Sequence, residues 1–179
     1  MGLSRKSFLS LCSLALLACL PSAAAEKEKL ADLQARFDRE SSSVHKAKLL
    51  EKLGGAQFEE TRRLEKAGDF NSVGLLWEKF RDNARATLDA LKKQHADAER
   101  HSNGYRELEV VLREGIRELD QTLMLAPEEF RPPLQIVRGD LAAMDDQVLR
   151  MLFPRRSIDI PPTPQPTPPI APPSPENQP

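Results

Sequence analysis

Residues 71–93 read NSVGLLWEKFRDNARATLDALKK, and no other stretch of the chain places so much apolar bulk on one stripe. Its large apolar side chains recur at steps of three and four, which is the period of one face of an α-helix. The chain's only tryptophan stands in this stripe. Such a helix has to lie against other helices, so the stretch predicts a bundle with this tryptophan in its core. The stripe consists of Val73, Leu76, Trp77, Phe80, Ala84, Leu88 and Leu91.

Segments with the same helical period lie on both sides of this stretch. Glycines, prolines and serines separate them, as expected for the connections between helices. The fold predicted from these patterns is all-α, an antiparallel helical-hairpin bundle of about four to five helices. The flanking segments are residues 26–37, 44–53, 56–67, 105–125 and 134–151.

Cap and turn residues predict where these helices begin and end. Ser43 is a candidate N-cap. The glycine pair at residues 54–55 predicts a break or kink, because two glycines cost a helix about 2 kcal/mol relative to alanines. Residues 68–70 predict a tight turn, after which Asp69 or Asn71 caps the central helix.

The second half of the chain carries similar signals. We expect the central helix to continue to His101 and residues 102–104, Ser-Asn-Gly, to end it. Gly115 lies on the apolar stripe of its helix, which predicts a close contact with another helix. Gly139 falls on the solvent side of the last helix. Pro127 is predicted to lie in the first turn of the short segment that follows residue 126.

Residues 1–25 are predicted to be a secretory signal peptide. Residues 8–20 are apolar apart from Ser10 and Ser13 and are too short to span a bilayer, and a basic pair precedes them. Pro21 and the three alanines at residues 23–25 have the spacing of a signal-peptidase site. We therefore expect an exported protein, periplasmic or secreted, whose mature chain begins at Glu26.

Two alternatives for this segment remain open. Residues 16–19, Leu-Leu-Ala-Cys, resemble a bacterial lipobox, in which Cys19 becomes the lipidated first residue and places the protein on a membrane. The second alternative is that residues 1–25 are not cleaved and anchor the protein in a membrane. Cys12 and Cys19 are the only cysteines, so cleavage after Ala25 leaves no thiol, no disulfide and no cysteine metal site.

The composition changes sharply after Phe153, so residues 154–179 are predicted to be a disordered proline-rich tail. Residues 160–179 contain ten prolines and almost no charge. Such a segment adopts an extended polyproline-type backbone of about 3.1 Å per residue, or roughly 60 Å in all. We expect this tail to act as a spacer or docking strap.

The remaining residues, 26–153, have the size of one helical domain. The chain has a net charge of −1, and from residue 26 onward it has 24 basic and 27 acidic residues. This balance produces no long-range attraction to nucleic acid or to an anionic membrane surface. Overall charge therefore does not identify a partner.

Three groups of side chains are candidates for chemistry, and each has a simpler interpretation. His95 and Glu99 have the spacing of two metal ligands on one helix face, but a third ligand is recognisable only if His45 or His101 approaches through folding. Trp77 with Phe80 is typical of a core rather than of a ligand cage.

Neighbouring carboxylates resemble exposed helix faces or first turns rather than acid–base pairs. The arginines Arg106, Arg113 and Arg117 alternate with glutamates, which predicts a salt-bridged surface. The mature chain has no cysteine and no Gly-x-Ser-x-Gly sequence, so a nucleophile is not indicated. The carboxylate pairs are Glu59-Glu60, Glu128-Glu129 and Asp145-Asp146.

These patterns together predict an exported, non-enzymatic interaction or scaffold protein of the cell envelope. We assign no catalytic, cofactor-binding or metal-binding residue, and the expected partner is a protein of the envelope, with no nucleic acid. Membrane attachment is expected only if Cys19 is lipidated. The alternative is a periplasmic helical sensor for a small molecule or a metal. An open apolar groove favours the first function, and a closed pocket containing His95 and Glu99 favours the second.

Overall fold

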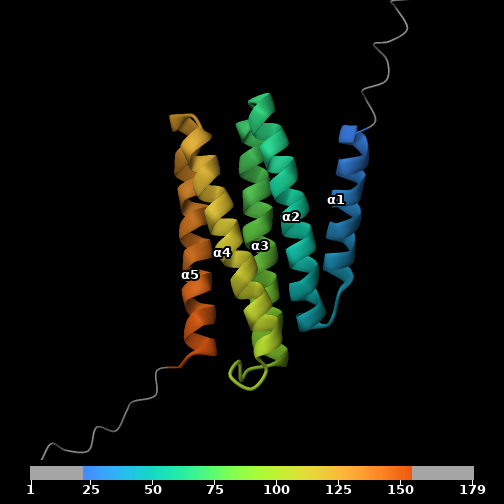
Figure 1. Cartoon of the computed structure of the whole chain (residues 1–179), viewed down its shortest axis with the longest axis vertical. Coiled ribbons are helices and arrows are strands. Elements are labelled where there is room, and N and C mark those ends of the chain that lie inside the picture. The colour runs from blue at the N-terminus through green and yellow to red at the C-terminus, as the bar shows by residue number, and fades with distance from the viewer. Residues whose placement is uncertain (1–21, 155–179) are drawn as a thin grey trace, which may run out of the picture.

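The computed structural model describes the backbone of residues 22–154 and the side chains of residues 28–154. This part of the chain forms five α-helices and one short 3₁₀-helix and contains no strand, which confirms the predicted all-α bundle (Figure 1). The predicted signal-peptide cleavage signals before Ser22, the lipobox and the tail from residue 155 onward lie outside the described residues. The helices are α1 (Ser22–Arg39), α2 (Ser43–Ala67), α3 (Phe70–Gln94), α4 (Ser102–Leu125), η1 (Glu128–Phe130) and α5 (Arg131–Leu152).

Successive helices run in opposite directions and form two hairpins, α2–α3 and α4–α5 (Figure 1). The hairpins pack so that α2 lies beside α4 and α3 beside α5, while α3 also contacts α4. Because each hairpin begins in the same direction, α2 and α4 are parallel neighbours. Helix α1 packs against α2, and the Gln34 and Asn83 side-chain amides link it to α3 through hydrogen bonds of 3.0 and 3.2 Å.

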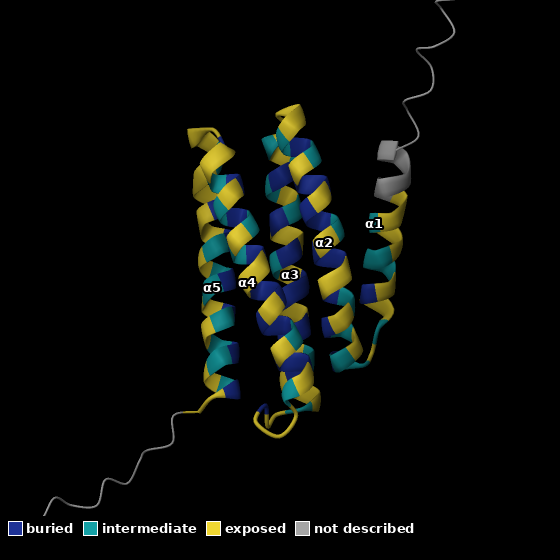
Figure 2. Ribbon diagram, in the orientation of Figure 1, coloured by how far each residue is buried: buried dark blue, intermediate teal, exposed yellow. Residues whose placement is uncertain are grey.

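The core lies where the apolar stripes of the helices face one another (Figure 2). Every residue of the predicted α3 stripe is buried except Leu76, which is half-buried. Trp77 is only 1% exposed. The prediction that α3 is the central helix and that Trp77 and Phe80 belong to the core is therefore confirmed.

The ring of Phe80 in α3 lies between two glycines of neighbouring helices. A Cβ atom on Gly54 of α2 would lie 3.1 Å from Phe80 Cε2, and one on Gly115 of α4 would overlap the ring. The predicted close contact at Gly115 is confirmed. The predicted break at residues 54–55 is wrong, because α2 continues through both glycines and the missing side chain of Gly54 accommodates the Phe80 ring.

The caps around α2 agree in part with the sequence. The N-cap is Ser42, whose hydroxyl accepts the His45 N–H at 3.4 Å, rather than the predicted Ser43, which is buried at the first helical position. The predicted turn after α2 is confirmed: Gly68 takes the left-handed conformation with φ 75°, and Asp69 caps α3 by accepting the Ser72 N–H at 3.1 Å.

The connection from α3 to α4 differs from the prediction. Helix α3 ends at Gln94 rather than at His101, and residues 102–104 begin α4 instead of ending α3. Two tertiary contacts explain the difference. A Cβ on Gly104 would meet the side chains of Leu91 and Val44, and the Tyr105 hydroxyl donates to the backbone carbonyl of His95 at 2.8 Å.

Two further boundaries complete the comparison. Helix α1 begins at Ser22, four residues before the predicted start, because alanines 23–25 are strong helix formers. Gly139 is exposed, as predicted. Within residues 22–154, no helix is both long enough and apolar enough to cross a membrane.

Replacing Trp77 with alanine should lower the free energy of unfolding by about 3–5 kcal/mol, since it empties a large volume in the core. Leu75→Ala is the control, because Leu75 lies on the same helix and is 67% exposed. Chemical denaturation of both variants measures the difference. A wild-type tryptophan emission typical of indole in water, together with an unchanged Trp77→Ala midpoint, would refute the burial.

Gly115→Ala should destabilise the bundle by about 1–3 kcal/mol, because the added methyl group overlaps the Phe80 ring. Gly139→Ala makes the same change on an exposed helix surface with nothing within 4 Å, so it should stabilise by about 0.5–1 kcal/mol. Thermal melts of the two variants compare them directly. Equal shifts of the same sign would contradict the close contact.

Candidate functional site

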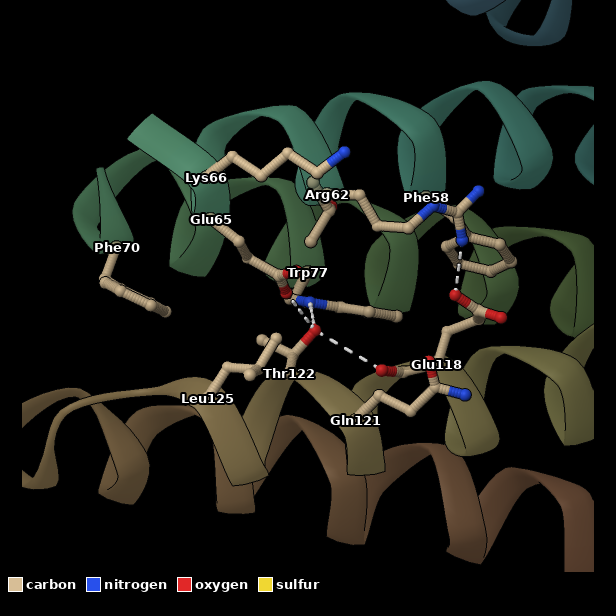
Figure 3. A pocket seen from close by; sticks show the side chains of 11 residues that line it. Phe58, Arg62, Glu65, Lys66, Phe70, Trp77, Glu118, Gln121, Thr122 and Leu125 are labelled. Carbon is tan, nitrogen blue, oxygen red and sulfur yellow. Dashed lines mark hydrogen bonds and ion pairs between the residues drawn. The ribbon is translucent and has the colours of Figure 1, made fainter. Parts of the chain in front are cut away.

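A groove runs between α2 and α4 near their C-terminal ends, with α3 beneath it (Figure 3). We call it the α2–α4 groove, and its volume is about 470 Å³. Because α2 and α4 are parallel neighbours, their side chains line the two walls of the groove. The lining residues are Phe58, Thr61, Arg62, Glu65 and Lys66 of α2, Phe70 and Trp77 of α3, and Glu118, Gln121, Thr122 and Leu125 of α4.

The floor of the groove is aromatic and fixed by ring packing. Phe58 stacks on Trp77 with ring centroids 5.4 Å apart, and Trp77 meets the edge of Phe80 at 5.8 Å. Phe70 stacks on Phe130 of η1 at 5.8 Å. Aromatic pairs of this geometry resist rearrangement, so the floor is a preformed apolar surface.

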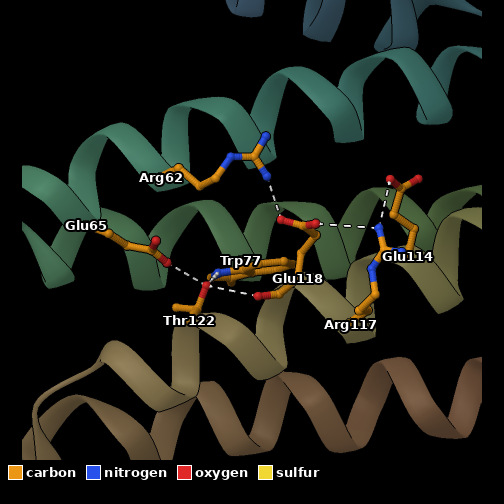
Figure 4. A network of polar contacts seen from close by, with 7 residues as sticks. All are labelled: Arg62, Glu65, Trp77, Glu114, Arg117, Glu118 and Thr122. Atoms are coloured by element: carbon orange, nitrogen blue, oxygen red, sulfur yellow. Dashed lines mark hydrogen bonds and ion pairs between the residues drawn. The ribbon is translucent and has the colours of Figure 1, made fainter.

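A hydrogen-bonded network joins this floor to both walls (Figure 4). The indole Nε1–H of Trp77 donates to the hydroxyl oxygen of Thr122 at 3.3 Å. The same hydroxyl lies 2.6 Å from Glu65 Oε1 and 3.3 Å from the backbone carbonyl of Glu118, and it donates to the closer carboxylate. Thr122 therefore connects α3 to α2 from its position on α4.

The rim of the groove carries charged and polar groups. Arg62 of α2 bridges the groove to Glu118 of α4, with 2.6 Å between Nη1 and Oε2. Arg117 approaches the other oxygen of that carboxylate at 3.7 Å. Gln121 and Leu125 are exposed, and Leu125 retains 64% of its accessible surface. The mouth thus offers an exposed apolar side chain beside polar groups.

The two carboxylates of the groove make contacts within the protein. The lining residues include no histidine, serine or cysteine. The two carboxylates that line the groove are engaged, Glu65 by Thr122 and Glu118 by Arg62. Glu65 Oε1 and Glu118 Oε2 thus accept hydrogen bonds from side chains of the groove itself.

The structure does not place His95 and Glu99 on one helix face. His95 is the C-cap of α3 and Glu99 lies in the following connection, because α3 ends at Gln94. The rings of His95 and His101 stack with centroids 5.2 Å apart. No group of three or more histidine, aspartate or glutamate side chains among the described residues has the geometry of a metal site.

The neighbouring carboxylates divide between exposed and buried positions. Glu59, Glu128, Glu129 and Asp146 are exposed, as predicted. Glu60 is buried and forms an ion pair with Arg63 at 2.5 Å, so its predicted exposure is wrong. The predicted salt-bridged arginine surface is confirmed for two of its members, because Arg113 pairs with Glu109, and Arg117 with Glu114 and Glu118.

The sequence alone does not indicate the α2–α4 groove. By their spacing, Thr122 and Phe58 stand on the apolar stripes of their helices, whereas Arg62, Glu65 and Glu118 have the positions of ordinary helix-surface residues. Their pairing depends on α2 lying beside α4, and helical periodicity shows which face of a helix is apolar without showing which helix covers it. The one available signal was the polar Thr122 within an apolar stripe, since buried hydroxyls need hydrogen-bond partners.

Asp145 of α5 occupies an unfavourable position for a carboxylate. Burial raises the pKa of Asp145, and repulsion from Glu109 raises it further, while Arg113 acts in the opposite direction. Its Oδ1 atom is buried and has no hydrogen-bond partner. The pKa of Asp145 is therefore higher in the folded chain than in the unfolded chain, which means that the protonated carboxyl stabilises the fold relative to the ionised one. This stabilisation is lost as the pH rises through the folded-state pKa.

Asp145→Asn should therefore raise the melting temperature at neutral pH, and this gain should shrink as the pH falls toward the ordinary aspartate value of 3.8. Asp146→Asn is the control, since Asp146 is exposed and pairs with Arg150 on the surface. Melts across this pH range test the sign. A loss of stability at neutral pH would show that the Asp145 carboxylate is favourable in the fold.

Comparison of the chain with known proteins adds no relative. No protein-family model, no curated protein and no solved structure matches it. The function has to follow from the sequence and from the geometry of the bundle.

Proposed function

We propose that this chain is an exported, non-enzymatic interaction protein of the cell envelope and that it binds a segment of a partner protein in the α2–α4 groove. The observation that carries this proposal is the open groove with a fixed aromatic floor and an exposed Leu125 at its mouth. An open apolar groove is the feature that favours an interaction protein over a sensor with an enclosed site.

The lining determines the kind of segment that fits. An apolar side chain of the partner would contact Leu125 and Phe70, which are the more accessible apolar groups of the groove. The Arg62–Glu118 pair and Gln121 would contact polar groups beside it. An amphipathic segment with one or two apolar anchors satisfies both requirements, since binding energy concentrates on a few buried anchors within a polar rim.

Export and the tail enter this proposal from the sequence. Residues 1–25 carry the signal that would direct the chain to the envelope, and residues 160–179 would add a spacer or docking strap. A strap contributes binding surface without contributing to the fold. Deleting residues 160–179 should accordingly leave the melting temperature unchanged in a thermal melt and should reduce co-sedimentation of the protein with its envelope fraction.

The second candidate function is a sensor for a small molecule. The groove volume of about 470 Å³ lies within the range of small-molecule sites, roughly 300–1,000 Å³, and favours this alternative. A metal sensor is not supported, because His95 and Glu99, whose spacing suggested a metal site, do not share a helix face. An enzyme remains the least supported function.

Photo-crosslinking within the native envelope tests the partner and its position. A photoreactive amino acid in place of Leu125 should capture a protein partner, because this position faces the groove. The same group in place of Met124 is the matched control, since Met124 is the adjacent residue, is 80% exposed and lies outside the groove. Captured proteins are identified by mass spectrometry.

The outcomes separate the two candidates. A protein cross-linked from position 125 and not from position 124 supports the proposal, and Leu125→Glu should abolish its capture from a second groove position, Gln121. A small molecule retained in native mass spectrometry, with no protein captured, supports the sensor. Equal capture from positions 124 and 125 would contradict binding in the groove.

A further inference from the structure

A second hollow lies at the junction of α1 and α2, at the end of the bundle opposite the α2–α3 turn. We call it the α1–α2 hollow, and its volume is about 440 Å³. Four of its six lining residues are basic side chains or an imidazole, although the chain as a whole is slightly acidic. The lining residues are Arg36, Arg39, Glu40, His45, Lys48 and Leu49.

The basic groups of this hollow have few partners. The side chains of Arg36, Arg39 and His45 make no hydrogen bond or ion pair within the described residues. Lys48 has Glu107 at 3.7 Å, and both groups remain partly exposed. The one carboxylate that lines the hollow belongs to Glu40, and its Oε1 atom accepts the backbone N–H of Ser42 at 2.8 Å.

The basic groups of the hollow repel one another, and the start of α2 adds the positive end of a helix dipole. His45 lies in the first turn of α2, where anions are preferred, and Lys48 lies in the next turn. The first turn of α2 contains no acidic residue. Arg36 and Arg39 add two cations from the last turn of α1 to the same hollow, so the repulsion comes from two helices.

Hydrogen bonds hold the two walls together despite this repulsion. Lys46 donates from Nζ to the carbonyls of Phe37 and Glu40 at 3.1 and 3.4 Å, and its ammonium lies 4.5 Å from the Phe37 ring centroid. Gln94 of α3 donates to the Ser41 carbonyl at 2.7 Å and accepts the Ser43 N–H at 3.0 Å. These contacts join the end of α1 and the start of α2, so the basic groups lie on two walls that the backbone holds next to each other.

We propose that the α1–α2 hollow is a binding site for a phosphate group. Arg36 and Arg39 would donate from one wall and Lys48 and His45 from the other. Guanidinium groups present paired N–H donors that match the several oxygens of a phosphate, and a dianion offsets the repulsion among the basic groups. The site is separate from the α2–α4 groove and does not depend on the function proposed for the groove.

The test uses the full mature chain with two probes that share this chemistry. Isothermal titration with inorganic phosphate measures binding of the free ion. Co-sedimentation with phosphatidylcholine vesicles, with and without phosphatidic acid, measures binding of the same group on a lipid. Binding of either probe is expected, and it should weaken with added salt because the basic groups are exposed.

The variants assign the binding to the hollow. Arg36→Gln with Arg39→Gln should weaken binding by about tenfold or more, since hydrogen bonds to charged groups are the strong ones. Arg36→Lys with Arg39→Lys keeps both charges but loses the paired guanidinium donors, so it should bind more tightly than the double glutamine variant and more weakly than the wild type. The matched control is Lys79→Gln with Arg150→Gln, which removes two exposed charges outside both the hollow and the groove and should bind as the wild type.

Each result has a defined meaning. Binding of phosphate alone identifies a free ion as the ligand, and binding only to acidic vesicles identifies a lipid headgroup. The proposal is overturned if neither probe binds, or if the control loses as much affinity as the double arginine variant. Circular dichroism confirms that each variant keeps its helix content, which is expected because Arg36 and Arg39 are exposed.

Discussion

The structure depends on the contact of Phe80 with two glycines. The ring projects from α3 and lies against Gly54 on α2 and Gly115 on α4, both of which lack the side chain that would displace it. This contact sets how closely the two hairpins approach, because α3 touches both α2 and α4. Protein interiors are close-packed, so a methyl group at Gly115 has to displace the Phe80 ring, while one at Gly54 makes a tight contact with it.

The α2–α4 groove lies next to this contact. The Phe80 ring packs against Phe58 at 5.1 Å and against Trp77 at 5.8 Å, and these two rings form the floor of the groove between the C-terminal ends of α2 and α4. Thr122 then satisfies the Trp77 indole and the Glu65 carboxylate together. The same polar group stabilises the core and shapes the binding surface, since a buried N–H without a partner costs about 1–3 kcal/mol.

The sequence predicts which residues are buried better than it predicts where helices end. Burial of the apolar stripe of α3 is predicted from the sequence because residue spacing alone defines a helix face. The break predicted at residues 54–55 is wrong because helix propensity is a weak preference that tertiary contacts override. Here the contact is that of the Phe80 ring with Gly54. The end of α3 at Gln94 depends on Tyr105 bonding to His95, a contact between separate helices.

Both candidate sites combine residues whose proximity depends on the fold. Arg62 and Glu118 are far apart in the chain and pair only because α2 lies beside α4. Arg36 and His45 gather in one hollow because Lys46 and Gln94 fix the α1–α2 junction. The net charge of the chain is a sum over all residues and does not show where charges cluster. A net charge near zero is therefore compatible with a basic hollow at one end of the bundle.

A double-mutant cycle on Gly115→Ala and Phe80→Leu measures the central contact most directly. Leucine is smaller than the ring, so it should make room for the added methyl group, and the cost of Gly115→Ala should fall in the Phe80→Leu background. We predict a coupling free energy of about 1 kcal/mol or more from chemical denaturation of the four proteins. Additive effects of the two substitutions would contradict the account, because they would show that Phe80 and Gly115 do not share one packing constraint.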